Sequence, residues 1–455
     1  MSTPQRGPDF LSPSPFIPPA AVPARPVPAP AGPLPLPRRP NRWWPLAVVG
    51  LVVLAVLLGF FMTRDRGGGQ GPTVMPPSSP STSITPQLTH PTPQPTYDVS
   101  SAPDGSLLAT DGSTGLHVVD TMSDVTVVTT DDLGETLVVK ADGTVWAWGS
   151  NKFGALGVGD TTYVSQPQRV NLDDVVAVVT KVGTTYALTG DGEVWGWGAS
   201  LAGTAEYLSH SVTPLQIVGL PPIKQIAEGS GVAYGLDGDG RIWAWGDILS
   251  VLEGMGNPDD PLSQWGDVPS SIPGISGAVQ IAASYNGGVA LLGDGTVWTW
   301  GTGDFGEIGD GTTSTNKTPV QVPGLPSVVA IAKGESTTYA LASDGTVWCW
   351  GFNLFGQCGT GENPTSQTSP GAMHLSPVQI PGLSGVSQIA SNTQMAYAWT
   401  ADGVYAWGDG ALMNLMDWHY TPGANGIASP TLVSALPPVK SIVDGQDTYL
   451  ITGAP

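Results

Sequence analysis

The sequence predicts an all-β fold: a seven-bladed β-propeller, closed by a blade split between the two chain ends and preceded by one transmembrane helix. Three observations lead to this prediction. A phrase of the type Asp-Gly-x-Val-Trp-x-Trp-Gly recurs about every 50 residues, half-units of the same repeat stand at both ends of the repeat region, and an uncharged apolar stretch precedes that region. The two cysteines in 455 residues exclude a disulfide-stapled scaffold and a cysteine-rich zinc module.

Residues 1–42 form the first segment and contain fourteen prolines without helical or strand periodicity. Such a composition cannot bury a core, so we expect a disordered, Pro-rich tail. Charge is distributed unevenly: residues 1–66 carry seven arginines and two acidic residues, whereas residue 67 onward carries nine basic and thirty-five acidic residues, a net charge of −26. A domain this acidic repels phosphate backbones, so no nucleic-acid partner is expected.

Residues 43–63 are twenty-one residues without a charge, enough to span about 31 Å as a helix, which matches a bilayer core. A cleaved signal peptide and a buried core helix are the alternatives, but no small-residue cleavage site follows the apolar stretch. Three arginines crowd its N-terminal flank, whereas two arginines and an aspartate follow it. We therefore expect a single-pass anchor in the cytoplasmic membrane with a cytoplasmic N-terminus. Residues 64–97, rich in Gly, Pro, Ser and Thr, are expected to be a linker.

The remaining residues, 98–455, carry the repeat. The Asp-Gly phrase begins at six positions separated by 48 to 58 residues: Asp142, Asp191, Asp239, Asp294, Asp344 and Asp402. A period near 50 with one strand-like phrase per unit indicates a propeller or a solenoid. Apolar alternation on both sides of each Asp-Gly pair predicts two antiparallel strands joined by a tight hairpin turn.

The two ends of the repeat region decide between these architectures. Residues 439–452 match the first half of a unit, and residues 104–120 match the second half. Six complete hairpins and one hairpin shared between the termini make seven units. A blade assembled from both chain ends closes a ring and removes exposed sheet edges.

These phrases, together with glycine-rich loops at 150–160, 302–311 and 352–361, resemble the repeats of the RCC1 (regulator of chromosome condensation) family. The resemblance implies a seven-bladed propeller. The corresponding loops at 199–207, 247–256 and 409–417 lack the glycine pattern, so those blades are expected to be irregular. The family's founder is a nucleotide-exchange factor for a small GTPase, a plant relative is a photoreceptor that uses clustered tryptophans, and some secreted relatives inhibit β-lactamases. Membership in such a family predicts the fold better than the activity.

Most of the recurring side chains have a structural interpretation. Eleven of the sixteen tryptophans occupy repeat positions, which favours packing between neighbouring blades over a sensing array. Cys349 and Cys358 could form a disulfide outside the cytoplasm, but both occupy slots held by small or apolar residues elsewhere, which favours two buried, unbonded thiols. Asp237 and Asp239 could suggest a calcium loop, but hairpin turns explain them.

Specificity is more plausible where the sequence does not repeat. Two inserts lengthen the period, at 248–273 and at 410–430. The side chains that we select as candidate partner-binding residues are Asp259, Asp260 and Trp265 in the first insert and Trp418, His419 and Tyr420 in the second. Exposed aromatic residues on loops are favoured interface anchors, although loose rim loops are the plain alternative.

No convergent acid, base or nucleophile group is evident, and no metal or cofactor motif is present, so we expect neither an enzyme nor a cofactor. The sequence is best explained as a membrane-anchored, extracytoplasmic protein-binding or scaffolding module, with inhibition of a secreted enzyme as a narrower version. The alternative is a cell-envelope protein that binds or hydrolyses glycans through its aromatic loops.

Overall fold

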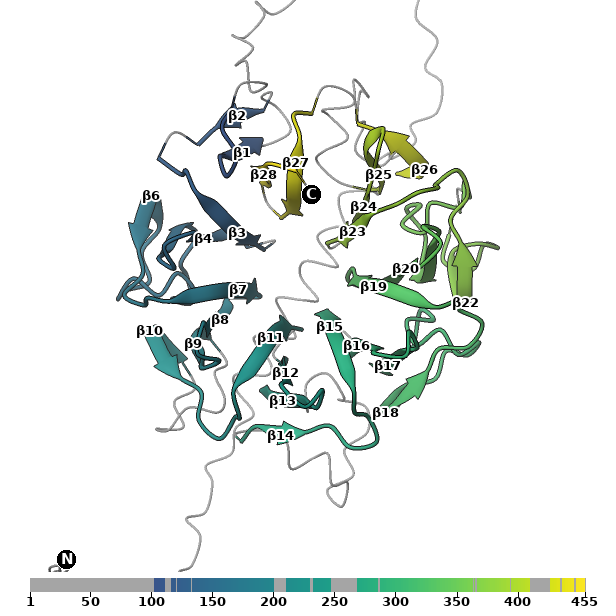
Figure 1. Cartoon of the computed structure of the whole chain (residues 1–455), viewed down its shortest axis with the longest axis horizontal. Helices are drawn as coiled ribbons and strands as arrows, with labels where there is room; N and C mark the ends of the chain where they lie inside the picture. The colour runs from purple at the N-terminus through teal and green to yellow at the C-terminus, as the bar shows by residue number, and fades with distance from the viewer. Residues whose placement is uncertain are drawn as a thin grey trace, which may run out of the picture. The chain divides into compact units, whose positions relative to one another are not determined.

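The computed structural model describes residues 102–454 except 111–115, 120, 132, 200–209, 230–231, 247–267, 285–286, 363, 365, 393, 410–425, 434–435 and 446. The described residues form seven four-stranded antiparallel sheets arranged as blades around a central axis (Figure 1). The innermost strands of the blades surround that axis. The all-β, seven-bladed propeller predicted from the sequence is therefore confirmed.

Six blades are continuous in sequence. Blade 1 contains β3 (Val125–Thr130), β4 (Glu135–Lys140), β5 (Val145–Gly149) and β6 (Val164–Arg169). Blade 2 contains β7 (Val175–Lys181), β8 (Thr184–Thr189), β9 (Val194–Ala199) and β10 (His210–Gln216). Blade 3 contains β11 (Ile223–Glu228), β12 (Val232–Asp237), β13 (Ile242–Gly246) and β14 (Ser270–Ser271).

The next three blades repeat this order. Blade 4 contains β15 (Ala278–Ser284), β16 (Gly287–Leu292), β17 (Val297–Gly301) and β18 (Asn316–Gln321). Blade 5 contains β19 (Val328–Lys333), β20 (Thr337–Ala342), β21 (Val347–Phe352) and β22 (Met373–Gln379). Blade 6 contains β23 (Gln388–Ser391), β24 (Met395–Thr400), β25 (Gly403–Gly408) and β26 (Ile427–Leu432).

Blade 7 is built from both chain ends. Its two inner strands are β27 (Val439–Asp444) and β28 (Thr448–Thr452), and its two outer strands are β1 (Leu107–Thr110) and β2 (His117–Val118). The register pairs Leu108 with Leu450 and Ala109 with Tyr449. The predicted split blade is confirmed.

The Asp-Gly turns connect the blades as well as the strands. In each turn the glycine has a positive φ, and in blades 1 to 4 its carbonyl accepts a hydrogen bond from the first residue of the next inner strand. Thus Val175 N donates to Gly143 O at 3.0 Å, and Val328 N donates to Gly295 O at 3.0 Å. One short turn therefore fixes the geometry within a blade and the position of its neighbour.

The same turn is reproduced across the chain ends in blade 7. Gly105 N donates to Thr452 O at 3.0 Å, as Gly192 N donates to Thr189 O within blade 2. Gly105 O in turn accepts from Val125 N of blade 1 at 2.9 Å. The break in the chain thus lies inside an Asp-Gly turn, and hydrogen bonds replace the missing covalent link.

Two faces of the propeller follow from this topology. We call the face that carries the Asp-Gly turns the turn face. The opposite face carries the connections between strands one and two and between strands three and four of every blade, and we call it the loop face. Both predicted inserts begin in the connection between strands three and four, after β13 and after β25, and they extend over β14 and into β26. Their flanking strands therefore end at the loop face.

The predicted tail (1–42), anchor (43–63) and linker (64–97) lie outside the described residues. Among the residues that the structure describes, no helix is long and apolar enough to cross a membrane.

We predict that Thr452→Val weakens ring closure. Thr452 is 2 % exposed, its hydroxyl donates to Pro103 O at 2.5 Å, and it accepts from Ser106 N at 2.9 Å. Valine keeps the shape but removes both hydrogen bonds, each worth about 0.5–1.5 kcal/mol, so the free energy of unfolding should fall by about 1–3 kcal/mol in urea titration. Thr431→Val, which removes one exposed hydrogen bond, is the control and should change it by less than about 0.5 kcal/mol. Equal effects of both variants would contradict the closure role.

Candidate protein-binding face

The tryptophan repeat packs each blade on the one before it. The second tryptophan of each phrase is buried in five blades, at Trp197, Trp245, Trp300, Trp350 and Trp407, with at most 6 % of its surface exposed. In three cases the ring meets a tyrosine of the preceding blade edge to face, with centroids 5.6 to 6.1 Å apart. The expectation that these tryptophans pack between blades is confirmed.

The glycine-rich loops complete this packing from the loop face. A carbonyl of the loop accepts the indole N–H of the next blade: Trp197 Nε1 donates to Ala155 O at 2.7 Å and Trp350 Nε1 donates to Glu307 O at 3.0 Å. A glycine two residues further on lies against the ring. A Cβ on Gly309 would stand 2.7 Å from Trp350, and the φ of Gly309 is +78°. The glycine pattern exists because the loop backbone must touch the indole.

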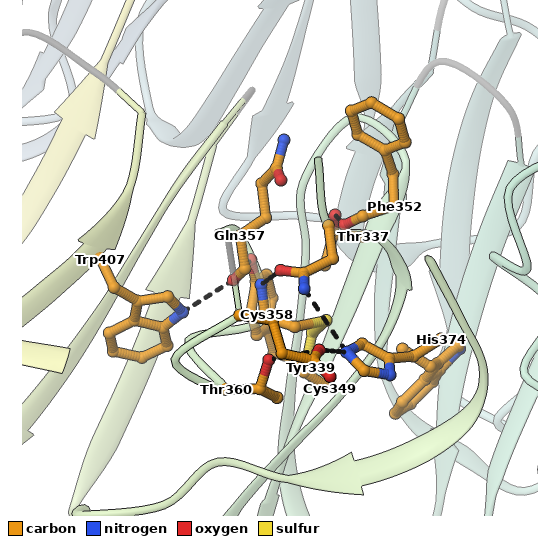
Figure 2. Close-up of a disulfide and its surroundings, with 12 residues drawn as sticks. Thr337, Tyr339, Cys349, Phe352, Gln357, Cys358, Thr360, His374 and Trp407 are labelled. Carbon is orange, nitrogen blue, oxygen red and sulfur yellow. Dashed lines mark hydrogen bonds and ion pairs between the residues drawn. A yellow bond between two sulfur atoms is a disulfide. The ribbon is translucent and has the colours of Figure 1, made fainter. Parts of the chain in front are cut away.

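In blade 5 this arrangement includes a disulfide (Figure 2). Cys349 of β21 and Cys358 of the loop are both fully buried and bonded, with Cα atoms 5.4 Å apart. Beside them, Gln357 O accepts hydrogen bonds from Tyr339 Oη and from Trp407 Nε1, both at 2.7 Å. The disulfide therefore fixes the glycine-rich loop to blade 5 at the point where the same loop contacts Trp407 of blade 6.

The expectation of two unbonded thiols was wrong, although their burial is confirmed. Its physical reason is visible in blade 4, where Thr299 and Ile308 occupy the same two slots. Thr299 Oγ1 donates to Ile308 O at 2.7 Å, so the strand slot and the loop slot touch. The residue types at each of the two positions, taken separately, do not indicate that the strand position and the loop position are in contact.

The first tryptophan of the phrase is half-buried, and in blades 1, 3, 4 and 5 its indole N–H caps the Asp-Gly turn. In blade 1, Asp142 Oδ1 accepts from the backbone N–H and the hydroxyl of Thr144, whose oxygen accepts from Trp146 Nε1 at 3.2 Å. These hydrogen bonds lower the pKa of Asp142. Asp237 accepts instead from Asp239 N, Arg241 N and Trp243 Nε1, so these aspartates form a turn as expected. Within the described part of the chain, no three His, Cys, Asp or Glu side chains could hold a metal ion.

Three buried carboxyl groups lie on the loop face near the ends of the inner strands. Asp131, Glu135 and Glu228 are at most 8 % exposed, and neither oxygen of Glu135 or Glu228 has a hydrogen-bond partner among the described residues. Burial, and secondarily the neighbouring Asp131, raises the pKa of Glu135 to about 9. Burial also raises the pKa of Glu228 well above its usual range, although Lys181 of blade 2 opposes the shift. With a pKa of about 9, Glu135 is protonated at neutral pH.

Four exposed apolar side chains lie on the same face of blades 1 and 2, and we call this set the apolar patch. It comprises Leu133, Phe153, Tyr163 and Val182, of which Tyr163 is 73 % exposed and the others 41 %. The Phe153 ring lies against Gly183, where a Cβ would approach it to 2.6 Å. The glycine-rich loop of blade 1 therefore contacts the β7–β8 connection of blade 2. Val182 holds a φ of +49°, which is strained for a β-branched residue.

The candidate residues selected from the sequence, Asp259, Asp260, Trp265, Trp418, His419 and Tyr420, lie outside the described residues. The same is true of most of the three loops expected to be irregular. The apolar patch was not predicted, because Phe153 recurs with Phe305 and Phe355 at one position of the glycine-rich loops, which indicates a structural role. Phe305 and Phe355 do pack against Phe352, whereas Phe153 is exposed.

The comparisons with known proteins agree with this architecture. A family model described as RCC1-like domain matches residues 116–451. A comparison of the sequence with curated proteins finds no match. Yeast RCC1 (Prp20) in complex with Kap60 is similar in structure, with a TM-score of 0.65 and 19 % identity over 77 % of this chain and 89 % of that chain.

Two further structures have the same fold. Prp20p from Saccharomyces cerevisiae gives a TM-score of 0.61 and 21 % identity over 72 % of this chain and 82 % of that chain. Human WBSCR16 gives a TM-score of 0.61 and 20 % identity over 74 % of this chain and 90 % of that chain. At these identities the similarity shows the fold alone.

We predict that Gly309→Ala destabilises the propeller through the loop-to-tryptophan contact. Gly324→Ala is a matched control, because its φ of +79° is the same but a Cβ there meets nothing within 4 Å. The difference between the two variants isolates overpacking from backbone strain and should be about 1–3 kcal/mol in the free energy of unfolding. Equal losses would show that the glycine serves only the turn conformation.

We further predict that Glu135 makes stability depend on pH. Its folded pKa of about 9 exceeds the ordinary 4.5, so its contribution is most favourable below about pH 4.5 and declines as the pH rises towards 9. Glu135→Gln should therefore leave stability near pH 5 almost unchanged and raise it by roughly 1–3 kcal/mol at pH 8. Glu193→Gln, at an exposed site, is the control. A gain independent of pH would contradict the assignment.

Proposed function

Because the chain belongs to the RCC1-like domain family, we propose that it is a protein-binding or scaffolding module, held at the cytoplasmic membrane by residues 43–63 with its propeller outside the cytoplasm. The yeast relative Prp20 has been seen bound to Kap60, and its binding to Gsp1p and histones has been studied. A propeller of this family offers a rigid frame on which loops can present a binding surface. Its partner would be an extracytoplasmic protein.

The apolar patch is the observation that carries this proposal. Leu133, Phe153, Tyr163 and Val182 come from two blades and expose large apolar side chains on the loop face. Exposed apolar side chains grouped on one face of a soluble domain mark interaction sites. The flanks of both inserts end on the same face, so the insert residues Trp265 and Trp418 would extend the surface.

The disulfide supports the proposed location. Disulfides persist in oxidising compartments and are rare in the cytosol. The bond between Cys349 and Cys358 is buried against the core of blade 5, where it stabilises the loop-face end of the propeller. Protease added to intact spheroplasts should therefore remove the propeller from the membrane fraction, whereas a protected, soluble propeller would contradict anchor and orientation alike.

Capture of partners from the cell envelope tests the function. Immobilised propeller should retain a protein partner, and Phe153→Ser should weaken that binding by about tenfold or more without lowering the melting temperature, as expected for an interface anchor. Val329→Ser is the matched control, because Val329 is 55 % exposed near the turn face. Trp265→Ala and Trp418→Ala test the inserts in the same assay. Capture of glycan instead of protein, or equal binding by the patch and control variants, would contradict the proposal.

If a secreted enzyme is retained, its activity should be measured with and without the propeller. Loss of activity on binding would establish the narrower role of inhibitor, and unchanged activity would leave a scaffolding role.

A further inference from the structure

The closing blade has a shorter connection between its third and fourth strands than blades 1, 4 and 5, whose loops accept the indole N–H of the next blade. In blade 1 the third and fourth strands are joined by residues 150–163, which reach Trp197 of blade 2. In blade 7 the corresponding connection comprises only residues 111–116, without the glycine-rich pattern. The next tryptophan along the ring is Trp148, and it is the one second-position tryptophan that is half-buried instead of buried.

A cavity of about 480 Å³ lies at this position, between blades 7 and 1. Trp148 and Tyr449 provide its aromatic wall, and Thr110, His117, Gln166 and Asp447 are among its polar lining residues. The two aromatic rings meet edge to face at 5.9 Å between centroids, and Trp148 Nε1 donates to Tyr449 Oη at 3.2 Å. That hydrogen bond replaces the loop carbonyl and holds the indole in position beside the cavity.

The charge of the lining selects the ligand class. Asp447 is half-buried and lies close enough to Tyr449 that it contributes, after burial, to raising the pKa of that phenol. None of the described residues that line the cavity is a lysine or an arginine. A carboxylate beside a tryptophan and a tyrosine favours a cation, because the ring faces and the carboxylate both attract positive charge. The net charge of −26 from residue 67 onward further concentrates cations near the surface.

We propose that the cavity between Trp148, Tyr449 and Asp447 binds a guanidinium or ammonium group presented by a basic segment of the partner protein. This inference rests on the proposed function and specifies the chemistry of the partner. Gln166 and Pro167 of the cavity lining belong to β6 of blade 1, the strand that Tyr163 of the apolar patch directly precedes. The apolar patch would bind the apolar part of the partner, and the cavity would bind one arginine or lysine side chain.

The test uses the full chain in nonionic detergent and two small probes, N-acetyl-arginine amide and N-acetyl-citrulline amide. The probes have the same shape, but only the first carries a charge. Titration followed by saturation-transfer NMR should show binding of the arginine probe at least about tenfold tighter than that of the citrulline probe. Added salt should reduce the difference.

Asp447→Asn should weaken binding of the arginine probe by about tenfold, while Asp402→Asn, an equal change of charge on the exposed turn face, should not alter it. Trp148→Phe should weaken binding as well, because phenylalanine is a poorer partner for cations. Melting curves of all three variants identify any that fail to fold. Equal binding of the two probes, or equal binding by Asp447→Asn and Asp402→Asn, would overturn the proposal.

The probe experiment and partner capture can fail independently. Arginine binding that depends on Asp447, with no captured protein, would support the cavity and contradict the proposed function. A captured protein that binds Asp447→Asn as tightly as the unaltered chain would support the function and contradict the cavity as its recognition site.

Discussion

The propeller depends on one contact, the packing of a strand-three tryptophan against the preceding blade. Each blade alone is a four-stranded meander with two apolar faces that would be open to water. The indole covers one of these faces and reaches the loop of the neighbour, where Ala155, Glu307 or Gln357 provides the accepting carbonyl. Because every blade needs a neighbour on both sides, the arrangement is stable only as a closed ring.

Closure explains why the chain ends are where they are, and also why one blade boundary differs from the others. The hydrogen bond from Gly105 to Thr452 reproduces an ordinary hairpin, so blade 7 loses little on the turn face. On the loop face the same blade has a short connection, and Thr110 of β1 stands at the position that Trp148 occupies in blade 1. The cavity beside Trp148 is therefore a consequence of how the ring closes. A scaffold made of near-identical units acquires in this way one boundary with its own chemistry.

Sequence periodicity predicted the seven blades, the split blade and the structural role of the tryptophans, because these features require the same residues at each repeat. It predicted poorly what occurs once. Cys349 and Cys358 were each compared with the residues at the same position of the other repeats. That comparison does not show that the two positions touch within one blade. Glu135 stands where Thr184 and Thr337 stand in blades 2 and 5, a departure that could have marked it as unusual. Its burial depends on tertiary packing that no local pattern records.

The candidate insert residues were selected because they do not repeat. Their composition suggested binding, and the described strands place their flanks on the loop face. The exposed Phe153 occupies the same position of the repeat as Phe305 and Phe355. Those two side chains pack against Phe352, whereas Phe153 is exposed, so the repeat position alone does not determine the environment.

The central claim is that loops cover the tryptophans of the next blade and that the closing blade leaves Trp148 open. Hydroxyl-radical footprinting with mass spectrometry measures the solvent accessibility of all the repeat tryptophans in a single sample. Trp148 should be oxidised several times faster than Trp197, Trp350 and Trp407. Equal protection of Trp148 and these three residues would contradict it.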